Sequence, residues 1–499
     1  MATAATYAFP FFAQTSSKVP EAIDFKEKFS ASEGESAINA LIDKLSALRL
    51  DAISVLSAVK HPEAHRSAKT GGPLLSEVPT FVESCIEDPK CIETARQKIS
   101  NYLAALRGLV DIEDEEKPIN GKSPWRTAPI SWTWSNVSEG STTKVNDAAY
   151  EFGSVLVAFG LWQLSLGHQL HERSVKDNSD TLAKLAYTTL LMGSGVLDSF
   201  LTVRQSGILD GMEGAPDLRE KTARAWSLMC LAHAQEITIA RGIEKKTSAL
   251  LIAKLCTDTS GKFHEAYTQL SSLVSPNGPA SPLEKLLAYL KFKKALYDAL
   301  AWMHYAMDFK ENEKHGEAVV AAQHSSKLAK AAEKECNAYI KTEPKTSGAA
   351  KEALMACMGR ALAAVDETAN RFLRENDMVY FSKVPPVLPD PIPRESLVKP
   401  TVYSLPTLDP AWADIPPPSS SQHASLPPPP PPPSLPATEG EKKKEVVEKE
   451  EEEDKKTEGT ASATAATAGA ETAASSAKDE DQKKKTKKKK SERSRCVLL

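Results

Sequence analysis

Cysteine is scarce in this sequence, with seven residues in 499 and no C-x-x-C pair. Such usage excludes the disulfide framework of small secreted domains and suits a reducing compartment. Six of the seven are scattered, several of them inside apolar helical patterns: Cys85, Cys91, Cys230, Cys256, Cys336 and Cys357. The seventh, Cys496, is the fourth residue from the end and belongs to a separate motif.

The sequence also lacks an excess of one charge and a long apolar run. Its 62 basic and 66 acidic residues give a net charge of −4, so the overall charge does not indicate a nucleic-acid binder. The most apolar stretch, Phe152–Gly167, is about three residues short of a bilayer span. We expect a buried core helix there and no transmembrane segment. No basic residue precedes Lys18, so a signal peptide is not expected either.

Motifs that carry catalysis are missing as well. The sequence shows no complete phosphate loop, no G-x-S-x-G elbow and no spacing typical of a metal site. Four histidines occur in pairs, and we interpret them as solvated or capping residues: His61 and His65, His168 and His171. The sequence therefore indicates that the protein is not an enzyme and holds no cofactor or metal. The remaining alternative of this kind is a helical enzyme whose site is assembled from distant helices.

Apolar residues recur at steps of three and four through most of the first 400 residues. This spacing puts them on one helix face. It predicts helices over 38–59 and 145–166, one starting near 282, and others near 180–204, 218–242, 247–273, 316–341 and 348–377. Ser281 and Glu284 have capping-box spacing, with Pro282 at the first helical position. Only Ile130–Val137 alternates like a strand, with Trp132 and Trp134 on one side. The expected fold class is therefore mainly α, an elongated solenoid-like domain with a small β element.

Composition divides the chain into a domain and a tail. Of the 33 prolines, 19 fall between Pro385 and Pro436, where missing amide donors favour an extended polyproline coil. From Glu441 onward the sequence is rich in Lys and Glu, then in Ala, Thr and Ser, then in Lys. Such sequence buries too little apolar surface to order itself. We predict a helical domain over 1–400, a Pro-rich linker over 401–440 and a disordered charged tail over 441–499.

The last four residues, Cys496-Val-Leu-Leu, have the C-a-a-X form, and leucine at the final position favours a geranylgeranyl group on Cys496. A basic run of net charge +8 precedes them, formed by Lys483, Lys484, Lys485, Lys487, Lys488, Lys489, Lys490, Arg493 and Arg495 against Glu492. One lipid chain anchors a protein only marginally, and a polybasic patch supplies a second signal of roughly 1 kcal/mol per basic residue. We therefore expect modification by a prenyltransferase and reversible attachment to anionic cytoplasmic membrane faces, endosomal or plasma membrane. The alternative is a nuclear-localisation or nucleic-acid-binding run.

Seven consecutive prolines, Pro427–Pro433, form the longest run of one residue type. A polyproline segment can dock on SH3, WW or profilin-like domains, or it can act as a stiff spacer. The sequence leaves both interpretations open. If docking dominates, the chain is a Pro-rich scaffold whose helical domain is structural.

Three stretches resemble the Bro-domain family of ALIX-like proteins. Ser227–Glu236 (SLMCLAHAQE) is similar to the family's L-x-x-LAQAQE helix, with His233 in place of the usual glutamine. Glu375–Pro385 (ENDMVYFSKVP) is similar to the N-D-x-x-Y-x-x-x-V-P stretch that closes the helical part, and Ile130–Trp134 resembles its aromatic strand. The likeness covers nearly all of 1–400. Direct passage from this domain to a Pro-rich tail and a C-a-a-X box resembles the layout of a short prenylated member of the family.

The resemblance implies a boomerang-shaped helical domain and an adaptor function. It implies binding of the C-terminal amphipathic helix of an ESCRT-III subunit in an apolar concave patch, in endosomal sorting or membrane remodelling. By motif position, it implies Leu228, Met229 and Leu231 as the partner-binding residues. The sequence leaves open which of the three face the partner and which belong to the core.

Overall fold

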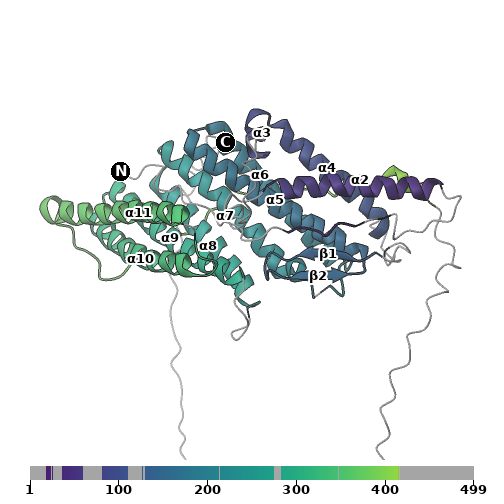
Figure 1. Cartoon of the computed structure of the whole chain (residues 1–499). Helices are drawn as coiled ribbons and strands as arrows, with labels where there is room; N and C mark the ends of the chain where they lie inside the picture. Colours follow the sequence, from purple (N-terminus) through teal and green to yellow (C-terminus); the bar gives the residue numbers. More distant parts are fainter. Residues whose placement is uncertain are drawn as a thin grey trace, which may run out of the picture. The chain divides into compact units, whose positions relative to one another are not determined.

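The computed structural model describes residues 18–59 (without 24 and 26–35), 81–110, 126, 130–274 (without 213) and 282–415 (without 347 and 414). Contacts divide the chain into two units, 1–418 and 419–499, and all described residues belong to the first. The described helices are α2 (Ser36–Ala58), α3 (Phe81–Glu87), α4 (Lys90–Val110), α5 (Ala148–Asp177), α6 (Asp180–Gln205), α7 (Glu220–Glu244), α8 (Ala249–Ser271), α9 (Pro282–Glu311), α10 (His315–Lys341) and α11 (Gly348–Glu375) (Figure 1). Shorter elements are β1 (Trp132–Ser135), β2 (Thr142–Val145), the 3-10 turns η3 (Pro216–Leu218) and η5 (Pro410–Trp412), and the π turn η4 (Asn376–Tyr380).

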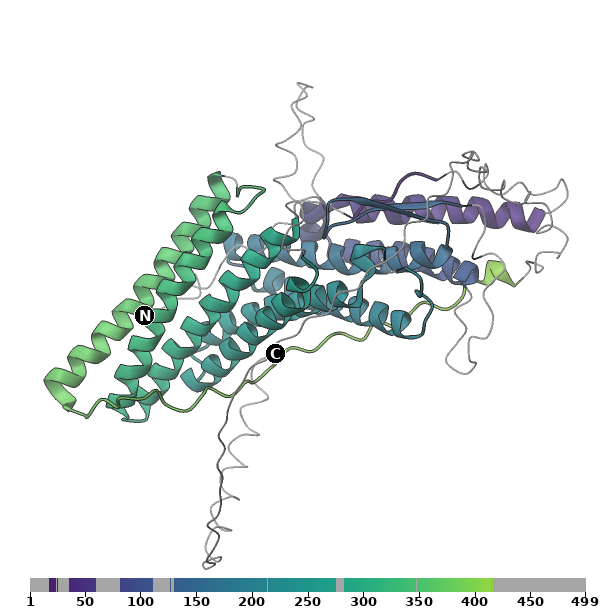
Figure 2. The same ribbon diagram turned by 90° about the horizontal axis from the view of Figure 1, so that it is seen from below.

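The long helices stack in chain order. From α4 to α11 each helix packs on the next one along the chain, and α2 packs on α4. Figure 2 shows the resulting body as elongated and bent. One apolar core runs through most of the stack, and a smaller one lies between α9, α10 and α11. The mainly α, solenoid-like fold class is therefore confirmed. Of the helices in the described part, none has the length and apolar character needed to cross a bilayer.

Local sequence explains where several helices begin. Asp147, Ser179 and Ser248 accept hydrogen bonds from the first-turn amides of α5, α6 and α8, as N-cap residues do. Pro282 is the first residue of α9, as predicted, while Ser281 lies outside the described residues.

Two helices, α3 and α4, were not predicted from the sequence. The signal for α4 was nevertheless present, because its buried apolar residues recur every three to four positions: Ile92, Ala95, Ile99, Leu103, Leu106 and Val110.

The predicted strand is one arm of a hairpin. β1 pairs antiparallel with β2, with Trp132 opposite Val145, and Trp132 and Trp134 are both buried. The chain near Pro20 adds to the free edge of β1, where the Glu21 amide donates to the Thr133 carbonyl at 2.9 Å.

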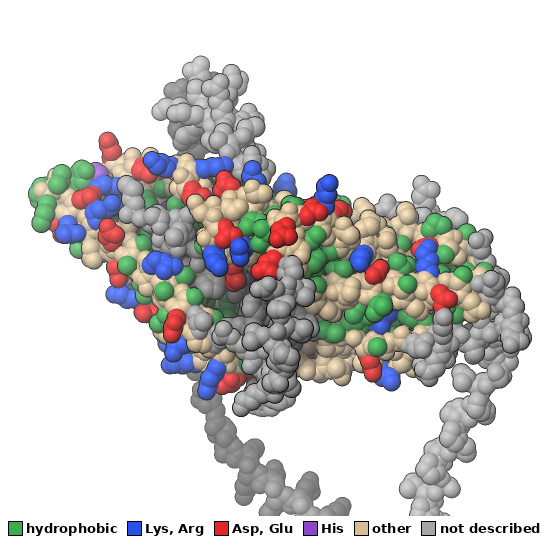
Figure 3. Space-filling model, turned by 45° about the horizontal axis from the view of Figure 1, so that its top comes forward, with side chains coloured by type: hydrophobic (Ala, Val, Ile, Leu, Met, Phe, Trp, Pro, Cys, Tyr) green, Lys and Arg blue, Asp and Glu red, His purple; other side chains and the backbone are tan. Residues whose placement is uncertain are grey.

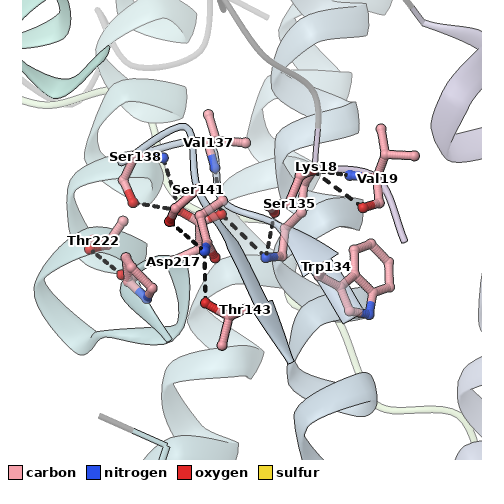
Figure 4. A network of polar contacts seen from close by, with 12 residues as sticks. Lys18, Val19, Trp134, Ser135, Val137, Ser138, Ser141, Thr143, Asp217 and Thr222 are labelled. Atoms are coloured by element: carbon pink, nitrogen blue, oxygen red, sulfur yellow. Dashed lines mark hydrogen bonds and ion pairs between the residues drawn. The ribbon is translucent and has the colours of Figure 1, made fainter. Parts of the chain in front are cut away.

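A buried carboxylate joins this hairpin to the entry of α7 (Figure 4). Asp217 accepts hydrogen bonds from the Val137 amide at 2.8 Å and from the Ser138 amide and hydroxyl at 3.0 and 2.6 Å. Lys18 Nζ lies 3.2 Å from the same carboxylate, and both side chains are almost fully buried. Burial alone would raise the pKa of Asp217, but Lys18 and these hydrogen bonds outweigh it and leave the pKa below its ordinary value. Three segments distant in sequence are thus tied together.

Residues 382–415 form an extended strap that crosses several helices after α11. The Thr401 amide donates to the Leu191 carbonyl on α6 at 3.1 Å. Arg107 on α4 donates to the Pro406 carbonyl at 2.6 Å. At the end of the strap, Trp412 Nε1 donates to the Ala105 carbonyl at 2.8 Å.

Close contact between strap and helices requires glycine at several places. A Cβ on Gly195 would collide with the Thr401 carbonyl, and one on Gly108 would collide with the Trp412 ring. The chain between 401 and 415 is therefore packed against the helices, although we predicted from the sequence that the domain ends at 400. The compact unit continues to Pro418 because side chains such as Tyr403 and Trp412 pack against its core.

Candidate partner-binding site

Helix α7 carries the three residues that the sequence assigned to partner binding. Leu228 and Leu231 are half-buried, whereas Met229 has no exposed surface and lies in the core. Adjacent helical residues point about 100° apart, so all three cannot share one face. This placement removes Met229 from the expected partner contacts and leaves Leu228 and Leu231, one turn apart, at the surface.

The strap crosses α7 on the same helix face. Gln235 follows Leu231 by four residues and Leu228 by seven, which places the three on one side of the helix. The Leu397 amide of the strap donates to Gln235 Oε1 at 3.3 Å, and Gln235 Nε2 donates to Asp258 of α8 at 2.7 Å. The two leucines therefore lie beside the strap, on the face that it crosses. We call the surface formed by Leu228, Leu231 and the neighbouring strap residue Leu397 the α7 face.

Polar side chains border the α7 face. Ser227 donates to Asp198 Oδ1 of α6 at 2.8 Å. Burial raises the pKa of Asp198, although the Ser227 hydrogen bond and Arg224 act in the opposite direction. On the far side of the strap crossing, Lys254 Nζ lies 3.3 Å from Glu395 Oε2. A small apolar centre with a polar rim is the usual composition of a protein interface.

A buried polar cluster lies beneath this face. Glu236 Oε1 is 2.7 Å from Lys293 Nζ of α9, and its other oxygen is 3.2 Å from His233 Nδ1. Burial lowers the pKa of His233, and Lys293 lowers it further, so the ring is neutral at pH 7. His233, the position that departs from the family motif, also contacts His168 of α5, with ring centroids 4.7 Å apart.

The histidines of α5 correct a sequence interpretation. His168 is buried, and His171 is held at a pKa of about 4 chiefly by burial. His171 is half-buried, and neither histidine caps a helix, because α5 continues to Asp177. Within the described ranges, no group of three or more His, Cys, Asp or Glu side chains is placed to hold a metal ion.

Several predicted functional residues lie outside the described part of the chain. They are Cys496, the basic residues from Lys483 to Arg495, Pro427–Pro433, and the pair His61 and His65. Sequence reasoning also missed an exposed apolar turn after α11, around Phe381. The quoted ENDMVYFSKVP stretch contains this turn, but its exposure has no signal in the sequence.

Comparison with known proteins agrees with this geometry. The family model described as BRO1-like domain matches residues 86–424. The BRO1 domain-containing protein BROX of Mus musculus is 27% identical over 324 residues, which cover 64% of this chain and 76% of that protein. Programmed cell death 6-interacting protein of Rattus norvegicus is 25% identical over 322 residues, covering 62% of this chain and 34% of that protein.

Solved structures show the same fold. The ALIX BRO1 CHMP4C complex superposes with a TM-score of 0.52 at 20% identity, covering 80% of this chain and 97% of that chain. A structure described as the basis for endosomal targeting by the Bro1 domain gives 0.53 at 14% identity, covering 79% and 93%. The likeness inferred from the sequence, to ALIX-like proteins and to Brox in particular, is confirmed. The chain belongs to the BRO1-like domain family.

Proposed function

We propose that this protein is a membrane-tethered adaptor whose α7 face binds the C-terminal amphipathic helix of an ESCRT-III subunit. Family membership supports the adaptor role, and a related ALIX BRO1 domain has been solved in complex with CHMP4C. The observation that carries the proposal is the pair Leu228 and Leu231, half-buried and one turn apart beside the strap.

An amphipathic helix docks through apolar side chains spaced three and four residues apart. Two leucines one turn apart offer a complementary apolar strip, and the polar rim around Asp198 and Lys254 sets the orientation. Binding would cover the part of each leucine that is still exposed, and an aspartate in its place would put a carboxylate against the apolar side of the partner helix, so affinity should fall about tenfold.

The test is fluorescence anisotropy with a labelled peptide from the C-terminal helix of CHMP4C. Leu228→Asp and Leu231→Asp in the full-length protein are expected to weaken binding about tenfold. Leu50→Asp is the matched control, because Leu50 is 71% exposed on α2. Absence of binding to the wild type overturns the proposal, and unchanged affinity of both variants removes the α7 face as the site.

Membrane tethering is the second part of the proposal. It rests on the C-a-a-X form at Cys496 and the adjacent net charge of +8 between 483 and 495. Intact mass should show a prenyl group on the protein from its native cells, and Cys496→Ser should move the protein from the membrane fraction to the supernatant. Equal membrane fractions for wild type and Cys496→Ser would remove the anchor.

A further inference from the structure

Exposed hydrophobic residues concentrate at one end of the body. Of the thirteen large hydrophobic side chains that are exposed in the described part, seven fall within eleven residues: Met378, Val379, Tyr380, Phe381, Val384, Val387 and Leu388. We call these seven residues the apolar tip. Hydrophobic side chains gather at this end of the molecule in Figure 3, where α11 ends and the strap begins. Clusters of this kind mark interaction sites, whereas single exposed hydrophobic residues are normal.

The turn that carries the tip is rigid. Asn376 is buried, its Oδ1 accepts from the Ser382 amide at 3.1 Å, and its Nδ2 donates to the Ser382 carbonyl at 3.0 Å. The Phe381 amide closes the π turn on the Asn376 carbonyl at 2.7 Å. These bonds fix the direction in which the side chains between them point.

Phe381 is unfavourable in two respects. Its φ is 51°, in the left-handed region that bulky residues avoid, and 75% of its surface is exposed. Backbone strain at a non-glycine residue persists where the surrounding structure enforces it, and it concentrates at functional positions. A fold that strains the backbone in order to expose a phenyl ring points to a use for that ring.

Contacts with α9 and α10 form a base that holds the apolar tip in place. The Tyr380 ring stacks on His315 with centroids 3.5 Å apart, and Lys310 Nζ lies 4.5 Å above the same ring. Lys310 also pairs with Glu375 and covers Phe372 of the smaller core. Met378, Val379 and Phe381 project beyond this base, with exposures of 73%, 63% and 75%.

We propose that the apolar tip inserts into the surface of a lipid bilayer. Docking of a helix requires a groove, and a convex turn does not provide one. A bilayer surface accepts protruding apolar side chains, and aromatic rings are favoured at its headgroup level. The charge of the sequence around the tip is nearly balanced. Its basic residues are Arg371, Arg374 and Lys383, and its acidic residues are Glu375 and Asp377. Insertion is therefore hydrophobic, unlike the electrostatic attraction of the basic run.

This inference rests on the proposed membrane tethering, which brings the domain next to lipid. The 84 residues that follow Ile415 can span at most roughly 300 Å. An anchor at Cys496 therefore sets neither the height nor the orientation of the helical domain. The tip supplies the second contact, and it directs the α11 end of the body toward the membrane.

Insertion can be read at Phe381 itself. The probe is the full-length prenylated protein with vesicles of phosphatidylcholine, with or without phosphatidylserine, prepared with ordinary or brominated acyl chains. Phe381→Trp adds an indole at the tip, whose emission bromine quenches on contact. Val402→Trp is the matched control, because Val402 is 86% exposed on the strap. Relative to the wild-type background, we expect quenching of the added emission for Phe381→Trp and none for Val402→Trp.

A partition measurement gives the strength of the contact. Met378→Ser combined with Phe381→Ser should lower vesicle partition about tenfold, equivalent to about 1.4 kcal/mol. High salt should not abolish this difference, because screening acts on charges. Leu50→Ser, at an exposed leucine outside the tip, should leave partition unchanged.

The outcomes separate the two proposals. If the wild type binds vesicles but Phe381→Trp shows no more quenching than Val402→Trp, tip insertion is overturned and tethering stands. If the prenylated wild type binds no vesicles, tethering fails and the tip proposal falls with it. All four substituted side chains are exposed, so loss of folding is not expected, and thermal melts verify this.

Discussion

Replacing Asp217 with asparagine should expose how strongly the first unit depends on one buried ion pair. The side chain keeps its shape in Asp217→Asn but loses its charge. Lys18 Nζ, 3.2 Å away, is then a buried ammonium without its carboxylate. Removing one partner of a buried pair costs about 3–5 kcal/mol, because the remaining charge stays desolvated. We expect a loss of that size in the free energy of unfolding.

Replacing Lys18, the other partner of the ion pair, should lower the free energy of unfolding by less. In Lys18→Met, the Asp217 carboxylate keeps the hydrogen bonds from the Val137 amide and from the Ser138 amide and hydroxyl. We expect about 2–3 kcal/mol from the lost charge-assisted bond. Urea unfolding at pH 7, followed by circular dichroism and tryptophan fluorescence, measures both variants. Asp51→Asn is the control, since Asp51 and Lys98 form an exposed pair at 3.4 Å worth at most about 1 kcal/mol.

The dependence on pH follows from the lowered pKa of Asp217. The ionised form is favoured by folding, so its contribution is complete well above the unfolded pKa of about 3.9 and is lost as the pH falls through the folded value. The difference between wild type and Asp217→Asn should stay constant from pH 7 to about 5 and shrink below about 4. A cost below about 1 kcal/mol at pH 7, with an unchanged urea slope, would refute the reasoning.

Three further changes test other parts of the fold. Gly108→Val should force the Trp412 ring off α4, and limited proteolysis should then cut the strap between 401 and 415 faster than in the wild type. Asn376→Ala removes both side-chain hydrogen bonds to Ser382 and should speed hydrogen exchange of the Ser382 amide about tenfold. Burial holds the pKa of His304 at about 4, so the unfolded chain takes up a proton near pH 6.5 while the folded protein does not. His304 alone should therefore lower stability by up to about 1.4 kcal/mol per pH unit between pH 6.5 and 4, and His304→Gln should reduce the slope of stability against pH by that share.

Periodicity predicted most of the fold because it depends only on local spacing. Helices α5 to α11 begin and end within a few residues of the predicted ranges, apart from the longer C-terminal end of α5 and the end of α9, for which only the start was predicted. Strand β1 was predicted because Trp132 and Trp134 alternate with polar residues and turn their rings to the core. Such features can be recognised from a stretch of about ten consecutive residues.

Features that depend on distant segments were beyond the sequence. Leu228, Met229 and Leu231 look alike in a string of letters, and only the packing of α6 and α8 on α7 decides that Met229 is the buried one. Lys293 and Glu236 read as solvated charges, yet they pair inside the core from helices 57 residues apart. The Pro-rich strap reads as a linker because its burial comes entirely from helices that precede it.

The strap also changes how the stack of helices should unfold. A linear array of helices can open one layer at a time, because each layer contacts only its neighbours. Here the chain that leaves α11 returns past α7 and α6 and finishes against α4 at Trp412. Any helix layer between α4 and α11 can open only if the strap detaches. The layers should therefore unfold together and not one by one from the ends. A pull on the chain beyond Ile415 would load the Trp412 contact first, and release would travel from α4 toward α11.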